Sequence, residues 1–163
     1  MGRMHKSAAT LPVVGDDLIP AEVSSLRADG KFEHELAQSA ALLDWGKYPY
    51  GLGCDPTVAQ RKGDTLIGRK TGIERIARTG MWRLQSADRE PENLNGQIEE
   101  ILNRVTGDLE TWRALTLRFR VEFFCGLFLG GENEGLAISP SVLLALGQRG
   151  IELALDVYGY GPD

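Results

Sequence analysis

The 163-residue sequence is poor in the side chains on which metal binding and nucleophilic catalysis most often depend. It has two histidines, His5 and His34, and two cysteines, Cys54 and Cys125. Neither histidine lies in a recognisable motif, and neither cysteine belongs to a CxxC pair or has a histidine partner. We therefore expect no histidine-based catalytic site and no metal site, and we expect both thiols to be reduced and packed.

Long apolar runs are also missing. No stretch approaches the roughly 18 residues that a membrane-spanning helix needs. The first 17 residues lack the apolar segment and the small-residue cleavage site of a secretion signal. The sequence thus predicts a cytoplasmic protein without membrane association, and its length suits a single domain over residues 1–163.

Phosphate-binding loops and paired catalytic carboxylates find little support. No GxxxxGK[ST] motif is present, so the abundant glycines are interpreted as turn and close-packing residues. Paired carboxylates occur at three places, where turns and a solvated helix face explain them more simply than acid–base chemistry: Asp16 and Asp17, Glu99 and Glu100, and Glu132 and Glu134. We assign no catalytic residue and expect no cofactor.

Charge is distributed unevenly along the chain. Residues 1–80 hold 11 basic and 10 acidic side chains, a balance of +1, whereas residues 81–163 hold 7 and 13, a balance of −6. An acidic chain repels phosphate backbones, which counts against nucleic-acid binding. The exception is residues 60–83, with seven basic and two acidic side chains and a balance of +5.

Residues 120–158 predict a strand–strand–helix–strand unit around which the rest of the chain is organised. Alternation over 121–129 predicts a central strand, covered on both sides because phenylalanines occupy its second face. A glycine-rich turn and a short returning strand at 136–138 follow. Ser139 and Pro140 predict a helix start, with Val142, Leu143, Ala145 and Leu146 facing inward and Gly150 as its end. Residues 151–157 predict a strand with one buried face.

Elsewhere, strands are predicted at 8–14 and 80–85, with Pro12 at an edge or beside a bulge and with Trp82 and Leu84 on one apolar face. Helices are predicted at 20–26, 31–44, 94–105 and 109–117, and a long basic loop at 57–79. This order predicts an α+β fold: two layers, with helices packed on a mostly antiparallel sheet. The strand–turn–helix–strand pattern of residues 8–85 recurs in 120–158, which would fit a ferredoxin-like duplication.

Several segments together carry a resemblance: GDDLIPAEVSSL (15–26), LGCDPTVAQRKGD (52–64), MWRLQS (81–86), LNGQIEEIL (94–102) and most of 120–158. The chain resembles a bacterial family of small proteins catalogued as domain of unknown function 4279. The resemblance implies the fold class but no activity. It also implies that residues 27–51, including the aromatic loop from Trp45 to Tyr50, are an insertion.

A candidate ligand site comes from the basic loop at residues 60–64. Arg61, Lys62 and Asp64 combine two cations with a turn, and Trp82 and Arg83 follow on the next predicted strand. Such a group would suit a small anionic ligand, held by charge-assisted hydrogen bonds. The competing interpretation is a solvated loop whose charges bind nothing specific, with Trp82 in the core.

Two functions from different classes remain open. The first is a non-enzymatic protein-interaction module of the immunity type, whose acidic second half would attract a basic partner protein. The second is a binder of, or an enzyme acting on, a small anionic ligand at residues 60–64. Nucleic-acid binding rests only on the basic window and is the weakest of the three hypotheses.

Overall fold

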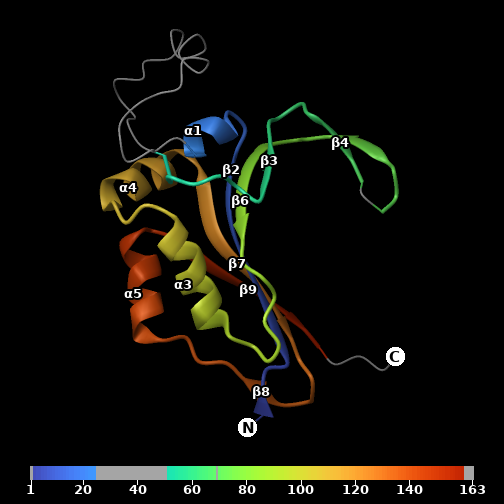
Figure 1. Ribbon diagram of the computed structural model, residues 1–163, viewed down its shortest axis with the longest axis vertical. Helices are drawn as coiled ribbons and strands as arrows, with labels where there is room; N and C mark the ends of the chain where they lie inside the picture. The colour runs from blue at the N-terminus through green and yellow to red at the C-terminus, as the bar shows by residue number, and fades with distance from the viewer. Residues whose placement is uncertain (1, 25–50, 69, 160–163) are drawn as a thin grey trace.

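A five-stranded sheet forms the centre of the molecule (Figure 1). The computed structural model describes residues 2–24, 51–68 and 70–159. Neighbouring strands of this sheet are antiparallel, except for the last two, which run parallel. Across the sheet the strands are β3 (Val58–Gln60), β6 (Gly80–Gln85), β2 (Lys6–Gly15), β7 (Arg120–Phe128) and β9 (Glu152–Tyr158).

Helices cover one face of this sheet, which lies to the left in Figure 1. They are α3 (Leu94–Arg104), α4 (Leu109–Arg118) and α5 (Pro140–Gln148), while the short α1 (Pro20–Ser24) lies next to β6. The predicted α+β fold, with helices packed on a mostly antiparallel sheet, is therefore confirmed. None of the helices in the described ranges is both long and apolar enough to cross a membrane.

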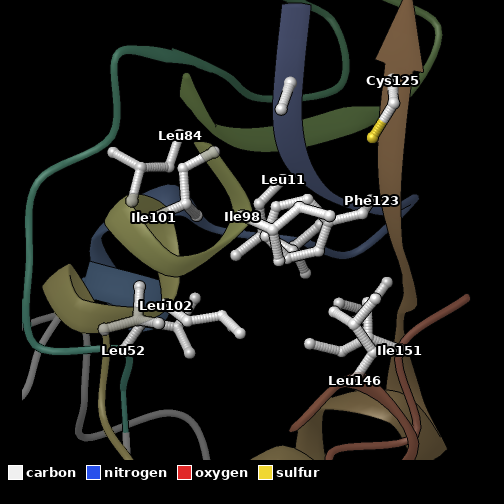
Figure 2. Close-up of a cluster of buried hydrophobic side chains, with 14 of the residues drawn as sticks. Leu11, Leu52, Leu84, Ile98, Ile101, Leu102, Phe123, Cys125, Leu146 and Ile151 are labelled. Atoms are coloured by element: carbon white, nitrogen blue, oxygen red, sulfur yellow. The ribbon is translucent and has the colours of Figure 1, made fainter. Parts of the chain in front are cut away.

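The core lies between these helices and the covered face of the sheet (Figure 2). Leu11, Leu84 and Phe123 enter it from three neighbouring strands and are fully buried. Ile98 and Ile101 of α3 meet them, because residues three or four apart share one side of a helix. The predicted apolar stripes of β6 and α3 are confirmed.

The ends of α5 follow the predicted signals. The Ser139 hydroxyl accepts a hydrogen bond from the Val142 N–H at 3.3 Å, and Pro140 takes the first helical position. Gly150 ends the helix with φ at +66°, a conformation that glycine adopts without steric cost. Leu143 is exposed, which corrects its predicted inward position, because α5 contacts the core only along a narrow stripe that includes Val142.

Pro12 lies in the middle of the sheet, which corrects its predicted edge position. β2 pairs with β6 on one side and with β7 on the other. The pairing with β7 is interrupted at Leu11 and Pro12 and resumes at Val13 in the same register. The missing proline N–H is therefore tolerated without an edge position and without an inserted residue.

Residues 57–79 are not the predicted loop. They contain β3 and a separate two-stranded ribbon of β4 (Thr65–Ile67) and β5 (Glu74–Ile76). Gly72, with φ at +65°, lies in the turn between the two strands, and its N–H bonds to the Gly68 carbonyl. The prediction failed because three-residue strands are too short for a clear alternation of polar and apolar residues.

The far face of the sheet carries no helix of the described chain, which corrects the prediction that β7 is covered on both sides. Its central position is confirmed, but Phe124 is 40% exposed. Phe128 on the same face stacks on Tyr158, with ring centroids 4.8 Å apart. On the other face, Leu155 and Val157 of β9 are also exposed, so the predicted buried face covers only the start of that strand.

The predicted strand at 136–138 is displaced to β8 (Glu134–Gly135), which pairs in parallel with β1 (Gly2–Arg3). The side chain of Asn95 explains the displacement. Its amide donates to the Ala137 carbonyl, and its oxygen accepts from the Ser139 N–H. These bonds occupy backbone groups that a returning strand would need.

The suggested ferredoxin-like duplication is absent. The first half of the chain supplies β2 and β6, which are antiparallel neighbours. The second half supplies β7 and β9, which are parallel neighbours joined through α5. A pair of equivalent β-α-β halves would require the same relation in both.

The predicted helix at 31–44, the aromatic loop from Trp45 to Tyr50 and almost all of the insertion at 27–51 lie outside the described residues. The residues beside this segment are close together. The Leu52 N–H donates to the Val23 carbonyl at 2.6 Å, and both side chains are buried in the core. The chain thus returns after the segment to nearly the point where it left.

Candidate functional site

The basic loop at residues 60–64 is a hydrogen-bonded turn at the end of β3. The Asp64 carboxylate accepts from the Arg61 N–H at 2.6 Å, and the Asp64 N–H donates to the Arg61 carbonyl at 3.2 Å. Gly63 has φ at +92°, which favours glycine, and its N–H donates to the Ala77 carbonyl. This turn continues directly into β4 and fixes the direction of the ribbon.

A cluster of charges surrounds this turn, and we call Asp16, Asp17, Glu22, Lys62 and Arg118 the charged cluster. The Lys62 ammonium bonds to the Asp16 carboxylate at 2.5 Å. The guanidinium of Arg118 lies 2.9 Å from the Asp17 carboxylate and 3.8 Å from that of Glu22. Lys62 is therefore already paired with a carboxylate, which an anionic ligand would have to displace.

Glu22 is the most enclosed carboxylate of the charged cluster. Burial raises its pKa above the usual glutamate range, while the positive charges of Arg118 and Arg61 act in the opposite direction. A carboxyl group with a raised pKa is a common feature of proton-transfer sites, but it also occurs in structural ion-pair networks. Here its neighbours are the ion pairs at one end of the sheet, which favours the structural role.

Trp82 and Arg83 are not brought together with the loop as a single site. Trp82 is fully buried and its indole N–H donates to the Ser24 hydroxyl at 3.0 Å. Arg83 is the next residue in β6, so its side chain lies on the opposite face of the sheet. Only Arg61, Lys62 and Asp64, of the five predicted residues, share one local structure.

Arg83 nevertheless has an unusual environment. Its Nε atom is buried and has no hydrogen-bond acceptor among the residues that the structure describes. Its partner in β3 is Val58, three residues before Arg61, so roughly 10 Å of strand separates the two arginines. The Arg83 side chain thus lies on the face of the sheet opposite to Trp82, whereas Arg61 and Lys62 are exposed in the loop.

The ribbon of β4 and β5 extends beyond the sheet at the upper right of Figure 1. We call residues 61–79 the arm. Its two sides are bonded to each other at the base, where the Ala77 N–H donates to the Asp64 carbonyl at 2.8 Å. Beyond that point, three isoleucines are exposed to solvent, namely Ile67, Ile73 and Ile76.

The sequence did not predict this apolar surface, because residues 57–79 were interpreted as a basic loop and their isoleucines were not considered. The available signal was the spacing of TLI (65–67) and ERI (74–76) around the glycine-bounded segment 68–72. That arrangement is typical of a hairpin. Isoleucines on such a hairpin have no helix to cover them.

Nucleophiles and metal ligands are sparse in the described structure. In residues 2–24, 51–68 and 70–159, no group of three or more His, Cys, Asp or Glu side chains is placed to hold a metal ion. Both cysteines are free thiols. Burial raises the pKa of Cys125 to about 12, and it also raises the pKa of Cys54, so neither is an activated thiolate at neutral pH.

The comparisons with known proteins leave the function open. A family model described as Domain of unknown function (DUF4279) matches residues 51–160, about two thirds of the chain. The match confirms the resemblance seen in the sequence, although it begins after the segment at 15–26. No curated protein matches the chain, and no solved structure matches it.

Proposed function

We propose that this chain, which belongs to the family described as a domain of unknown function (DUF4279), is a non-enzymatic protein-interaction module. The observation that carries the proposal is the exposed apolar face of the arm. Ile67 is 66% exposed and Ile76 is 60% exposed. An apolar surface of this kind costs solvation free energy unless a partner covers it.

The register of the ribbon places these two isoleucines together. Thr65 pairs with Ile76, and Ile67 pairs with Glu74. Directly paired residues, and residues two apart in one strand, point to the same face. Ile67 and Ile76 are therefore diagonal neighbours on one face of the ribbon, where a partner side chain could contact both.

The stability of the arm supports the same function. A two-stranded ribbon is marginally stable in water unless it packs on a further apolar surface. The described parts of β4 and β5 pair with each other and belong to neither of the other sheets. A partner that covers Ile67 and Ile76 would supply the missing surface and would order the ribbon.

Charge indicates what kind of partner the arm would take. Residues 61–79 contain six basic and two acidic side chains, a balance of +4. Exposed Lys70, Arg75 and Arg78 accompany the isoleucines. The partner we propose is a protein with an apolar groove bordered by carboxylates, since complementary charge accelerates encounter and selects among partners.

The test is affinity capture from a lysate of the source cells, in which the wild-type chain is compared with two variants. Ile67→Ser/Ile76→Ser removes the apolar face of the arm, whereas Leu117→Ser changes a still more exposed apolar residue on α4. We expect one protein to be retained in stoichiometric amount by the wild-type chain and by the α4 variant, and lost from the arm variant. Equal retention by all three would contradict the role of the arm.

The immunity-type function is the more specific form of this proposal. In that form the captured partner is a toxic protein, and the chain neutralises it by covering its active surface. Co-expression would restore growth to cells that produce the partner, and the arm variant would not. The alternative is that the acidic second half of the chain, residues 81–163, binds a basic partner protein. A complex in which this half and not the arm contacts the partner would support that alternative.

Arg83 favours a second candidate, the binding of a small anionic ligand. Its buried Nε atom has no acceptor among the residues that the structure describes, and Arg61 follows the neighbouring edge strand β3. Inorganic phosphate and citrate are suitable probes in a thermal-shift assay. A rise in Tm that is lost in Arg61→Ala/Lys62→Ala and kept in Arg113→Ala would support this candidate, whereas no rise with the wild-type chain would dispose of it.

Because the Lys62–Asp16 pair is exposed, Arg61→Ala/Lys62→Ala should change the free energy of unfolding by no more than about 1 kcal/mol. Loss of the ligand effect would therefore reflect binding rather than unfolding. A strong loss of stability would instead mean that the loop is structural, and it would contradict both the ligand-binding and the solvated-loop interpretation.

A further inference from the structure

The two edges of the main sheet differ in length. β3 forms one edge with three residues, whereas β9 forms the other with seven. β9 pairs with β7 on its inner side, and no strand of the described chain pairs with its outer side. A long unpaired edge is a template for pairing with another chain.

β9 lacks the features that usually protect such an edge. Its sequence, ELALDVY, contains no lysine, arginine or proline. Its side chains leave apolar surface on both faces of the sheet, since Leu155 is 47% exposed, Val157 is 54% exposed and Tyr158 is also exposed. Natural edge strands are ordinarily blocked by lysine, proline or a bulge, whereas the charges of β9 are the two carboxylates of Glu152 and Asp156, so this edge is suited to pairing.

The outer backbone groups of β9 can be identified from its inner hydrogen bonds. The Tyr158 carbonyl accepts from the Leu129 N–H, so Tyr158 directs its backbone groups toward β7. Successive residues of a strand direct their N–H and C=O groups to opposite sides. Leu153, Leu155 and Val157 therefore present their N–H and C=O groups to the open edge.

We propose that a second copy of this chain pairs there, antiparallel to β9, about a two-fold axis through Leu155. In this register Leu155 faces its own copy, and Leu153 faces Val157 of the second chain. All seven residues of β9 find a partner, and every outward N–H and C=O group of the strand forms a hydrogen bond. The two sheets join into one, with the helices of both copies on the same face.

The carboxylates of β9 select this register. With the axis at Leu155, Glu152 lies opposite Tyr158 and Asp156 lies opposite Ala154. Moving the axis to Ala154 would place Glu152 opposite Asp156, and moving it to Asp156 would place that residue opposite its own copy. Like charges directly opposite each other destabilise a strand pair, so the Leu155 register is favoured among those that use most of the strand.

The exposed side chains support a second copy rather than an unrelated peptide. Across the proposed axis, the exposed Leu155 and Val157 of one chain meet Leu155 and Leu153 of the other, so the same apolar row covers itself. α5 packs on β9 and carries two further exposed leucines, Leu143 and Leu144. The pairing would place both copies of α5 in one helical layer.

A charge at the axis tests the proposal. Leu155→Lys would place two ammonium groups directly opposite each other, and Leu155→Glu would place two carboxylates there. Because Leu155 is exposed in the single chain, neither change should disturb the fold. Sedimentation at about 0.15 M salt, which weakens the repulsion between the diagonal Asp156 carboxylates, would measure the oligomeric state over a wide concentration range.

We expect the wild-type chain to be a dimer and each Leu155 variant to be a monomer. An equimolar mixture of the Lys and Glu variants should dimerise again, because opposite charges then face each other. Leu117→Lys, on α4, and Ile67→Ser/Ile76→Ser, on the arm, should both remain dimeric. Dimerisation is thereby separated from binding at the arm.

Three results would overturn the proposal. The first is a wild-type chain that is monomeric at its highest soluble concentration. The second is a dimer that persists in both Leu155 variants, and the third is a mixture of the two variants that stays monomeric. A monomeric wild-type chain that binds an extended peptide of another protein along β9 would likewise contradict the proposed dimer.

Discussion

Phe123 of β7 is one of the largest fully buried side chains of the core. It is fully buried, and Figure 2 shows it between the strands and α3. Replacing it with alanine removes a large apolar volume and leaves a cavity, so Phe123→Ala should lower the free energy of unfolding by about 3–5 kcal/mol. Urea denaturation measures this change through the shift of the midpoint.

Phe124 provides a matched control in the same strand. Its ring lies on the opposite face of the sheet and is 40% exposed, so Phe124→Ala should cost about 1 kcal/mol. Equal effects of the two substitutions would contradict the assignment of one face of β7 to the core and the other to solvent.

Single residues also mark the limit of what the sequence could predict. Gln97 of α3 is a polar residue that the sequence did not single out, and it is fully buried. Its side chain accepts from the Ser7 hydroxyl at 2.6 Å and donates to the Ala87 carbonyl at 2.7 Å. Such a bond between residues 90 positions apart has no signature in local periodicity.

At the scale of an element, the cap of α4 is expected to depend on pH. The Asp108 carboxylate accepts hydrogen bonds from the Thr111 hydroxyl and N–H, and these bonds lower its pKa below the usual aspartate range. A group whose pKa is lowered by folding stabilises the fold above its unfolded pKa. That contribution is lost as the pH falls through the folded pKa.

Asp108→Ala should therefore destabilise the chain at pH 7, and the difference from wild type should shrink once the pH falls below the ordinary aspartate value of 3.8. Urea denaturation at neutral and acidic pH measures both differences. A difference that stays constant across this range would mean that the ionised carboxylate does not cap α4.

Elements with strong end signals were predictable, and elements without them were not. Asp108 and Ser139 mark the starts of α4 and α5, and both helices lie within one residue of their predicted starts. The two strands of the arm were not predicted because they are short and lie outside the main sheet. Without a buried face, its residues carry no contrast between apolar and polar sides.

At the scale of the whole molecule, the segment at 27–51 should be dispensable for folding. The Val23–Leu52 hydrogen bond holds its two flanks together, and the family match begins at residue 51. A variant in which a short turn replaces residues 27–51 should still unfold cooperatively in urea. Loss of the cooperative transition would show that the segment belongs to the core.

Composition and order predicted the fold class, because strands alternating with helices restrict how layers can pack. They did not predict the topology. The apparent repeat of residues 8–85 in 120–158 has antiparallel neighbours in one half and parallel neighbours in the other. The residues of the predicted site do not lie together either. They were grouped because they are close in a basic stretch of sequence, but Trp82 and Arg83 are consecutive in β6 and point to opposite faces of the sheet.

A partner protein bound at the arm would suppress local opening of the ribbon. Amide hydrogen exchange detects this change when it is measured on the chain alone and on its complex with the protein that the wild-type chain captures. The amides of β4 and β5 should exchange much faster than those of β2 and β7 in the free chain, since the ribbon can open locally. In the complex, protection should rise at residues 65–67 and 74–76. Unchanged exchange there, with new protection elsewhere, would contradict binding at the arm.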